Sequence, residues 1–317
     1  MVTIFSCSMY SVVIPVFNEE ANIQPLYQSL TSVMKKIGDY EIIFIDDGSI
    51  DSTFSHIKEL HTHDKKIKCI RFRKNFGQTP ALRAGFDFSH GDYIITIDGD
   101  LQNDPSDIPF LIDTIQQGYD VVSGWRSPRH DSFSKRIFSK FSNWLARRLT
   151  GVMLHDFGCT LKAYKKEAIK DIELYGEMHR YIPAVVAWKG FSVTELQVHH
   201  HPRRKGTTKY GATRLVKGFF DLVNFKFWSN FSTNPLHFFG GVGVFSFFGG
   251  FFMALYLVLM KFFFSEKLSN RPLLLLALLL MILGVQLTMF GFLAEMMTRN
   301  YFSSSQNRHF EIKDIIE

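Results

Sequence analysis

Two long apolar segments near the carboxyl terminus constrain the fold of this 317-residue chain most strongly. The first, LHFFGGVGVFSFFGGFFMALYLVLMKFFF, contains Lys261 as its one Lys, Arg, Asp or Glu, and the second, PLLLLALLLMILGVQLTMFGFLA, contains none. About 20 apolar residues span a bilayer, and helices in soluble cores rarely stay apolar on every face over such a length. The sequence therefore predicts two transmembrane helices, at 235–264 and 272–297, joined by a polar loop.

The preceding 200 residues have a different pattern, in which short β-rich runs alternate with amphipathic helical segments. This alternation is typical of an α/β domain with a mostly parallel sheet, which we expect to occupy residues 1–212. We predict strands at 10–15, 41–46, 67–72, 93–98, 120–124 and 191–198, and helices at 20–37, 51–61, 78–89 and 106–118.

Two segments interleave basic and aromatic residues, at about 133–150 and at 213–233. Both are typical of amphipathic helices that lie on a membrane surface. Soluble core helices are the alternative, but the apolar segments that follow directly favour the membrane interface. Residues 298–317 are expected to form a cytoplasmic tail.

Gly284 and Gly291 lie seven residues apart and can form a packing seam in the hairpin.

Charge and cysteine content restrict the partners and the compartment. The net charge is +6, which favours an anionic partner: a phosphate-bearing substrate, a membrane surface or a nucleic acid. No nucleic-acid-binding motif occurs. Three scattered cysteines indicate a reducing compartment. Two spans return the chain to the side of the membrane from which it left. Together with the reducing compartment that the cysteines indicate, this predicts a cell-membrane protein whose α/β domain faces the cytoplasm. Self-association through the hairpin is compatible with the sequence, which gives no number of subunits.

Acidic residues end two of the predicted strands. IIFIDDGSIDST (42–53) places Asp46 and Asp47 after one apolar run, and YIITIDGDLQNDP (93–105) places Asp98 and Asp100 after another. Ligands bind at the carboxyl edge of open α/β sheets. The oxygens of Asp98, Asp100 and Gln102 suit Mg²⁺ or Mn²⁺, which would neutralise a diphosphate leaving group. A solvated acidic turn is the alternative.

A series of motifs follows in order along residues 12–215: VVIPVFNEEANI, IDDGSIDST, RKNFGQTPALRAGF, DGDLQNDP, GWR, GCTLKAY, GEMHRYIP and RRKGTTKYG. With them the chain resembles the family 2 glycosyltransferases of the GT-A fold, a Rossmann-like α/β fold. Within that family it is similar to the polyprenyl-phosphate glycosyltransferases, the dolichyl-phosphate mannosyltransferase-like group. The paired membrane helices after the α/β domain match a bacterial subgroup.

The resemblance implies roles for particular residues. Nucleotide-sugar binding falls to Pro15, Phe17, Glu19, Ile45, Asp47, Asp98, Gly99, Asp100, Gln102, Arg126, Arg203 and Lys209, and metal binding to Asp98, Asp100 and Gln102. The catalytic residues implied are Asp100, Arg126, Arg203 and Lys209. The sequence departs from many relatives at Lys162, where they carry arginine, which puts bidentate phosphate recognition there in doubt. Uridine and guanosine donors both remain open.

The implied reaction is the transfer of a sugar, with inversion, from a UDP- or GDP-sugar to undecaprenyl or dolichyl phosphate. A phosphate monoester has a second pKa near 6, so the acceptor oxygen is ionised and attacks without a general base. Two alternatives are another membrane glycosyltransferase with a glycan or lipid acceptor, and a non-catalytic scaffold that binds nucleotide sugar. VHHHP (198–202) can ligate a metal, but it is more typical of a strand end beside the basic segment 203–211.

Overall fold

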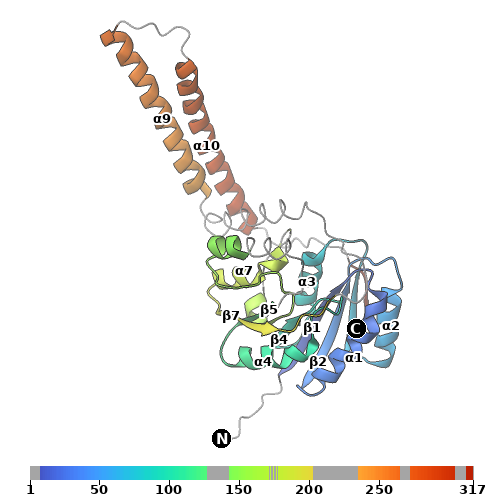
Figure 1. Ribbon diagram of the computed structural model, residues 1–317. Coiled ribbons are helices and arrows are strands. Elements are labelled where there is room, and N and C mark those ends of the chain that lie inside the picture. The colour runs from blue at the N-terminus through green and yellow to red at the C-terminus, as the bar shows by residue number, and fades with distance from the viewer. Residues whose placement is uncertain are drawn as a thin grey trace. The chain divides into compact units, whose positions relative to one another are not determined.

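The computed structural model describes residues 8–126, 143–202 except positions 171, 173, 175 and 177, 235–264, 272–303 and 312–316. The chain divides into two compact units. One is an α/β unit that contains the predicted sheet, and the other is a pair of long helices (Figure 1).

The α/β unit is built on an eight-stranded sheet with the order β7-β5-β6-β4-β1-β2-β3-β8. The strands are β1 (Met9–Val16), β2 (Asp39–Asp46), β3 (Ile67–Phe72), β4 (Tyr93–Thr96), β5 (Val121–Arg126), β6 (Lys162–Lys165), β7 (Val193–Val198) and β8 (Ile312–Ile316). β1 pairs in parallel with β2 and β4, β2 with β3, and β5 with β7, whereas β6 and β8 are antiparallel to their neighbours. The carboxyl ends of β1, β2, β4, β5 and β7 therefore share one edge of the sheet.

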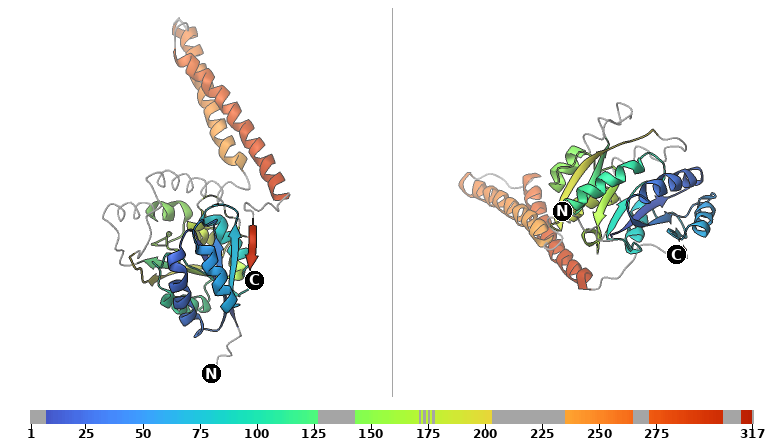
Figure 2. Two further views of the ribbon diagram at one scale, coloured as in Figure 1. Left: turned by 90° about the vertical axis from the view of Figure 1, so that its right-hand side faces the viewer. Right: turned by 90° about the horizontal axis from the view of Figure 1, so that it is seen from below.

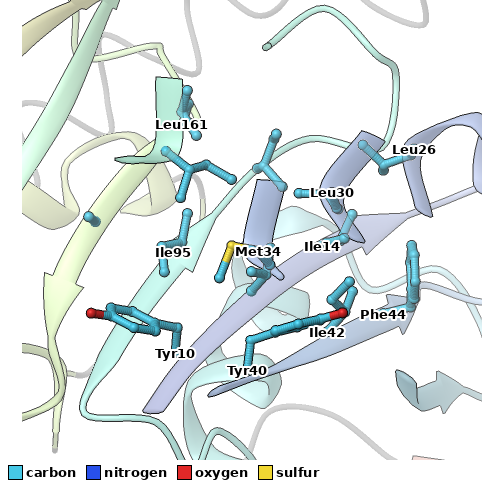
Figure 3. Close-up of a cluster of buried hydrophobic side chains, with 14 of the residues drawn as sticks. Tyr10, Ile14, Leu26, Leu30, Met34, Tyr40, Ile42, Phe44, Ile95 and Leu161 are labelled. Carbon is cyan, nitrogen blue, oxygen red and sulfur yellow. The ribbon is translucent and has the colours of Figure 1, made fainter. Parts of the chain in front are cut away.

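Helices cover both faces of this sheet. They are α1 (Glu20–Met34), α2 (Thr53–His63), α3 (Gln78–Asp87), α4 (Ile108–Gln116), α6 (Lys166–Ile169) and α7 (Ile182–Trp188), with the 3₁₀ turns η1 (Pro105–Asp107) and η2 (Met178–Arg180). Because strand side chains alternate between faces, Ile14 and Ile42 pack with Leu26 and Leu30 of α1 in one buried cluster (Figure 3). α3 lies against β1, where a Cβ on Gly85 would come within 2.2 Å of a methyl carbon of Val13.

The structure contains two strands that the sequence pattern did not predict. β6 is a four-residue strand whose lysines interrupt the apolar alternation. β8 lies beyond the apolar segments, where a tail was expected, and pairs with β3 in the register Cys69↔Ile316 (Figure 2). The strand predicted at 93–98 ends at Thr96, since the chain there leaves the sheet for the acidic turn.

The second unit consists of α9 (Pro235–Phe264) and α10 (Pro272–Ser303). Both helices are long and apolar enough to cross a membrane. They pack through small residues: a Cβ on Gly284 would lie 2.5 Å from the carbonyl oxygen of Gly243, and one on Gly291 would lie 3.1 Å from a methyl carbon of Leu236. The predicted glycine seam is therefore present in the hairpin.

The amphipathic helices predicted beside the membrane are described only in part. Residues 143–150 are helical, with Trp144 exposed. The remainder of the first segment, and all of 213–233, lie outside the described residues.

Candidate active site

The loops after β1 and β2 are joined into one structure at the carboxyl edge. The N–H of Asn18 donates to Oγ of Ser49 (2.9 Å), and Oδ1 of Asn18 accepts from the N–H of Ile50 (2.9 Å). Asn18 has a φ of 53°, a left-handed conformation that non-glycine residues adopt infrequently but asparagine tolerates best. This cross-link holds Phe17 and Glu19, both half-buried, beside the turn of Asp46 and Asp47.

The two aspartates that end β2 have different surroundings. Asp46 is fully buried, accepts from the N–H of Ser49 (2.8 Å) and pairs with Nε of Arg71 (3.3 Å). It therefore shapes the turn. Asp47 accepts from the backbone N–H groups of Phe76 (2.7 Å) and Gly77 (2.9 Å), just before α3 begins.

Burial raises the pKa of Asp47 to about 6, against the opposing effect of its two backbone hydrogen bonds. Each carboxylate oxygen has a second lone pair, so Asp47 can still accept from a ligand. Pro15 and Ile45, which the resemblance assigns to nucleotide-sugar binding, are paired across β1 and β2. They lie near the carboxyl ends of these strands, beside the turn of Asp46 and Asp47.

The acidic loop, residues 98–104, follows β4. Leu101 has a φ of 60°, and strained conformations of this kind persist where the surrounding structure enforces them. Beside it, the N–H of Gln102 donates to Oδ1 of Asp100 (3.2 Å). Gly99 lies against β1, since a Cβ there would come within 2.7 Å of Val16. Gln78, the first residue of α3, donates through Nε2 to Oδ1 of Asp98 (2.9 Å).

The acidic loop suits a divalent cation that is shared with a diphosphate. Burial and the neighbouring carboxylate of Asp100 raise the pKa of Asp98, a mutual repulsion that a bound cation would relieve. No cluster of three or more His, Cys, Asp or Glu side chains suited to a metal occurs in the described part of the chain. Mg²⁺ sites commonly use one or two carboxylates with substrate phosphates, which agrees with Asp98 and Asp100 assisted by Gln102.

Arg126, at the carboxyl end of β5, forms a bidentate ion pair with a buried carboxylate. Its Nε donates to Oδ2 of Asp156 (2.7 Å) and its Nη2 to Oδ1 (3.0 Å). Although burial alone lowers the pKa of Arg126, the charge of Asp156 outweighs it and raises that pKa. A guanidinium has five N–H donors, so this pairing leaves donors for a phosphate group.

Lys162 and Cys159 are buried near this pair, since the charges of Arg126 and Asp156 affect the pKa of both. Nζ of Lys162 donates to the carbonyl oxygen of Cys159, and burial lowers the pKa of the lysine. Burial also raises the pKa of the Cys159 thiol to about 11, so the thiol is protonated at neutral pH and unsuited to act as a nucleophile.

The structure brings together the predicted residues in the loops that follow β1, β2 and β4, and Arg126 at the end of β5. Arg203 and Lys209 lie outside the described residues. Sequence reasoning did not identify Asn18 or Gln78 and assigned no partner to Asp156. Their partners lie 31, 20 and 30 residues away in the chain, respectively, so no local pattern marks them.

Comparison with known proteins identifies the family of this chain. The model of glycosyl transferase family 2 matches residues 11–173. This chain belongs to that family. The enzyme is 37% identical over 97% of its chain, and 93% of the relative, to a dodecaprenyl-phosphate galacturonate synthase of Rhizobium johnstonii. It is 35% identical over 98% of its chain, and 91% of the relative, to an undecaprenyl-phosphate 4-deoxy-4-formamido-L-arabinose transferase of Pseudomonas aeruginosa.

Solved structures confirm the GT-A type of fold for this glycosyltransferase. Glucosyl-3-phosphoglycerate synthase from Mycobacterium tuberculosis, in complex with phosphoglyceric acid, superposes with a TM-score of 0.54 at 18% identity, over 70% of this chain and 80% of that one. The same protein in complex with Mn²⁺, uridine diphosphate and phosphoglyceric acid gives a TM-score of 0.52 at 18% identity, over 68% and 78% of the two chains.

Proposed function

We propose that this enzyme transfers a sugar, with inversion, from a UDP- or GDP-linked donor to polyprenyl phosphate, at a membrane and with Mg²⁺ or Mn²⁺. The observation that carries the proposal is the similarity, over nearly the whole chain, to two transferases named for polyprenyl-phosphate products or acceptors. The apolar hairpin supports it, because a polyprenyl tail must remain in the bilayer while its phosphate reaches the edge of the sheet.

Each cluster has a separate task in this reaction. Asp47, with Pro15, Phe17, Glu19 and Ile45, binds the nucleoside. Asp98, Asp100 and Gln102 hold the metal ion, which when bound neutralises charge on the diphosphate leaving group. Gln78 orients the carboxylate of Asp98 through its 2.9 Å hydrogen bond.

Positive side chains bring the acceptor and the donor together. The acceptor phosphate is largely ionised at neutral pH, so the enzyme must supply orientation and charge compensation rather than a base. Arg126 provides a guanidinium whose direction is set by Asp156. We assign the same charge-compensating role to Arg203 and Lys209.

We further propose that the α/β unit faces the cytoplasm. The chain leaves this unit before α9 and returns to it after α10, where β8 joins β3. Two membrane crossings between these points are consistent with β8 and the rest of the sheet lying on one side of the membrane. A carboxyl-terminal green fluorescent protein, which matures in the cytoplasm, is expected to fluoresce, and a carboxyl-terminal alkaline phosphatase is expected to be inactive.

The transfer activity is tested with the full-length protein in detergent. Labelled UDP- and GDP-sugars are supplied one at a time with Mn²⁺ and polyprenyl phosphate, and label is followed into the organic phase. We expect one donor to give product that EDTA and Asp100→Ala abolish. Asp113→Ala, which changes an exposed carboxylate on α4, is the matched control and should retain activity. Nucleotide-sugar binding without transfer from any donor would contradict the proposal and favour a scaffold.

A further inference from the structure

The end of β7 is joined to the acidic loop and η1 by two histidine–carboxylate pairs. The N–H of His199 lies 2.6 Å from Oδ2 of Asp107, and its Nδ1 lies 2.8 Å from Oδ1. Nε2 of His201 lies 3.0 Å from Oδ2 of Asp104. Ionised carboxylates only accept hydrogen bonds, so Nδ1 of His199 and Nε2 of His201 each carry a proton. We call these four residues the histidine clamp.

The main chains also pair between the two contacts of the clamp. The N–H of His201 donates to the carbonyl oxygen of Gln102 (2.8 Å), and Asn103 forms a β-bridge with His200. Nε2 of Gln102 donates in turn to the carbonyl oxygen of His201 (3.4 Å). Gln102 is therefore held by its main chain and by its side chain, while its own N–H contacts Asp100.

The exposure of these groups distinguishes the clamp from ordinary core packing. The side chain of His199 is 74% exposed, whereas that of Asp107 is 4% exposed. An exposed imidazole thus covers a buried carboxylate, and the hydrogen bond raises the pKa of His199. Little apolar area is gained at His199, so the hydrogen bonds rather than burial account for its placement.

We propose that His199 and His201 are positioning residues that hold the acidic loop in the conformation that presents Asp100 and Gln102 to the metal–diphosphate group. The inference rests on the function proposed above. The loop contains the left-handed Leu101, which needs support from its surroundings. Residues that hydrogen-bond to metal ligands, without binding the metal themselves, typically lower the metal affinity about 10- to 100-fold when they are removed.

The test measures binding by calorimetry, with UDP and GDP as probes, on the full-length protein in detergent with Mn²⁺ or with EDTA. His199→Ala and His201→Ala are each expected to weaken Mn²⁺-dependent nucleotide binding about 10-fold, and to leave binding in EDTA unchanged. His56→Gln, an exposed histidine of α2, is the control and should bind as the unaltered protein does.

Conservative variants separate positioning from direct metal ligation. The glutamine amide reaches about as far as Nε2 and the asparagine amide about as far as Nδ1, so His201→Gln and His199→Asn should restore binding. The exchanged pair, His201→Asn and His199→Gln, should not restore it. Equal binding by the matched and exchanged variants would overturn the inference.

A double-mutant cycle over His201→Ala and Asp104→Ala provides the second criterion. If the two side chains act through each other, the double variant should bind about as weakly as either single variant. Additive losses would show that His201 acts independently of Asp104 and would overturn the clamp. Because the cycle measures nucleotide binding and not sugar transfer, the clamp and the proposed function can fail separately. If the variants weaken nucleotide binding but the unaltered protein transfers no sugar, only the proposed function is contradicted.

Discussion

Arg126 and Asp156 form two parallel hydrogen bonds, 2.7 Å from Nε to Oδ2 and 3.0 Å from Nη2 to Oδ1, and the carboxylate is almost fully buried. Gly158 leaves room for the pair, since a Cβ there would lie 3.1 Å from Nη2. The direction of the guanidinium is thus set before any substrate binds. Preorganised charge of this kind needs no rearrangement during the reaction.

Removal of one partner from this pair should destabilise the protein and abolish sugar transfer. Asp156→Ala leaves the partly buried guanidinium of Arg126 without its counter-charge, and breaking a buried ion pair typically costs about 3–5 kcal/mol. Thermal unfolding of the detergent-solubilised protein measures the loss. The double variant Arg126→Met/Asp156→Leu should recover much of this stability without recovering activity. Asp39→Ala, which removes an exposed partner of Lys66, is the control and should unfold near the parent temperature.

Gly48 is expected to be essential for nucleotide binding. It has a φ of +74°, and a Cβ there would lie 2.5 Å from the carbonyl carbon of Lys74. Gly48→Ala should therefore separate the turn of Asp47 from the N–H groups of Phe76 and Gly77. We expect UDP or GDP binding, measured by calorimetry with Mn²⁺, to weaken at least 10-fold.

Gly118 offers a control that also has a positive φ but has no steric contact. Its φ is +114°, and no atom lies within 4 Å of a Cβ built on it. Gly118→Ala should lower the free energy of unfolding by about 1 kcal/mol and leave nucleotide affinity unchanged. Equal losses of affinity in the two variants would show that strain, rather than the contact with Lys74, is responsible.

The parts of the site that sequence predicts are those specified by one strand and the turn that follows it. Continuous apolar runs, typical of strands that are buried on both faces of a parallel sheet, place β1 and β2. The sequence pattern does not predict β6 and β8, because their formation depends on pairing with strands that are distant in the chain and not on local propensity. The histidine clamp was not predicted for the same reason. His199 and Asp107 are 92 residues apart in the chain, and the sheet order β7-β5-β6-β4 brings their segments together.

The glycine seam of the hairpin should tolerate no larger side chain. Gly284→Val would place a Cβ 2.5 Å from the carbonyl oxygen of Gly243 and 2.6 Å from the backbone nitrogen of Phe247. The two helices would have to separate and lose close packing, which drives helix association in membranes. We expect a lower unfolding temperature in detergent. Gly249→Val, where no atom lies within 4 Å of the added Cβ, should unfold as the parent does, and a matching loss there would contradict the seam.

Glu41 should make the α/β unit sensitive to acid. Its buried carboxylate lies near the amino end of β2, where it accepts from Oγ of Ser11 (2.5 Å) and the N–H of His90 (2.7 Å) and pairs with Nζ of Lys68 (3.1 Å). Burial by itself raises the pKa of Glu41, but these hydrogen bonds outweigh it and lower that pKa below its usual value. The folded state therefore favours the ionised form more than the unfolded state does.

The sign of the pH dependence follows from this shift. A lowered pKa contributes stability above the unfolded-state pKa of about 4.3 and loses it as the pH falls through the folded-state value. Glu41→Gln should thus unfold more easily than the parent at pH 7, and the difference between the two proteins should narrow below about pH 4. Glu59→Gln, on the exposed face of α2, should follow the parent curve throughout. A parent–variant difference that stays constant from pH 7 to pH 3 would show that Glu41 contributes through packing and not through its charge.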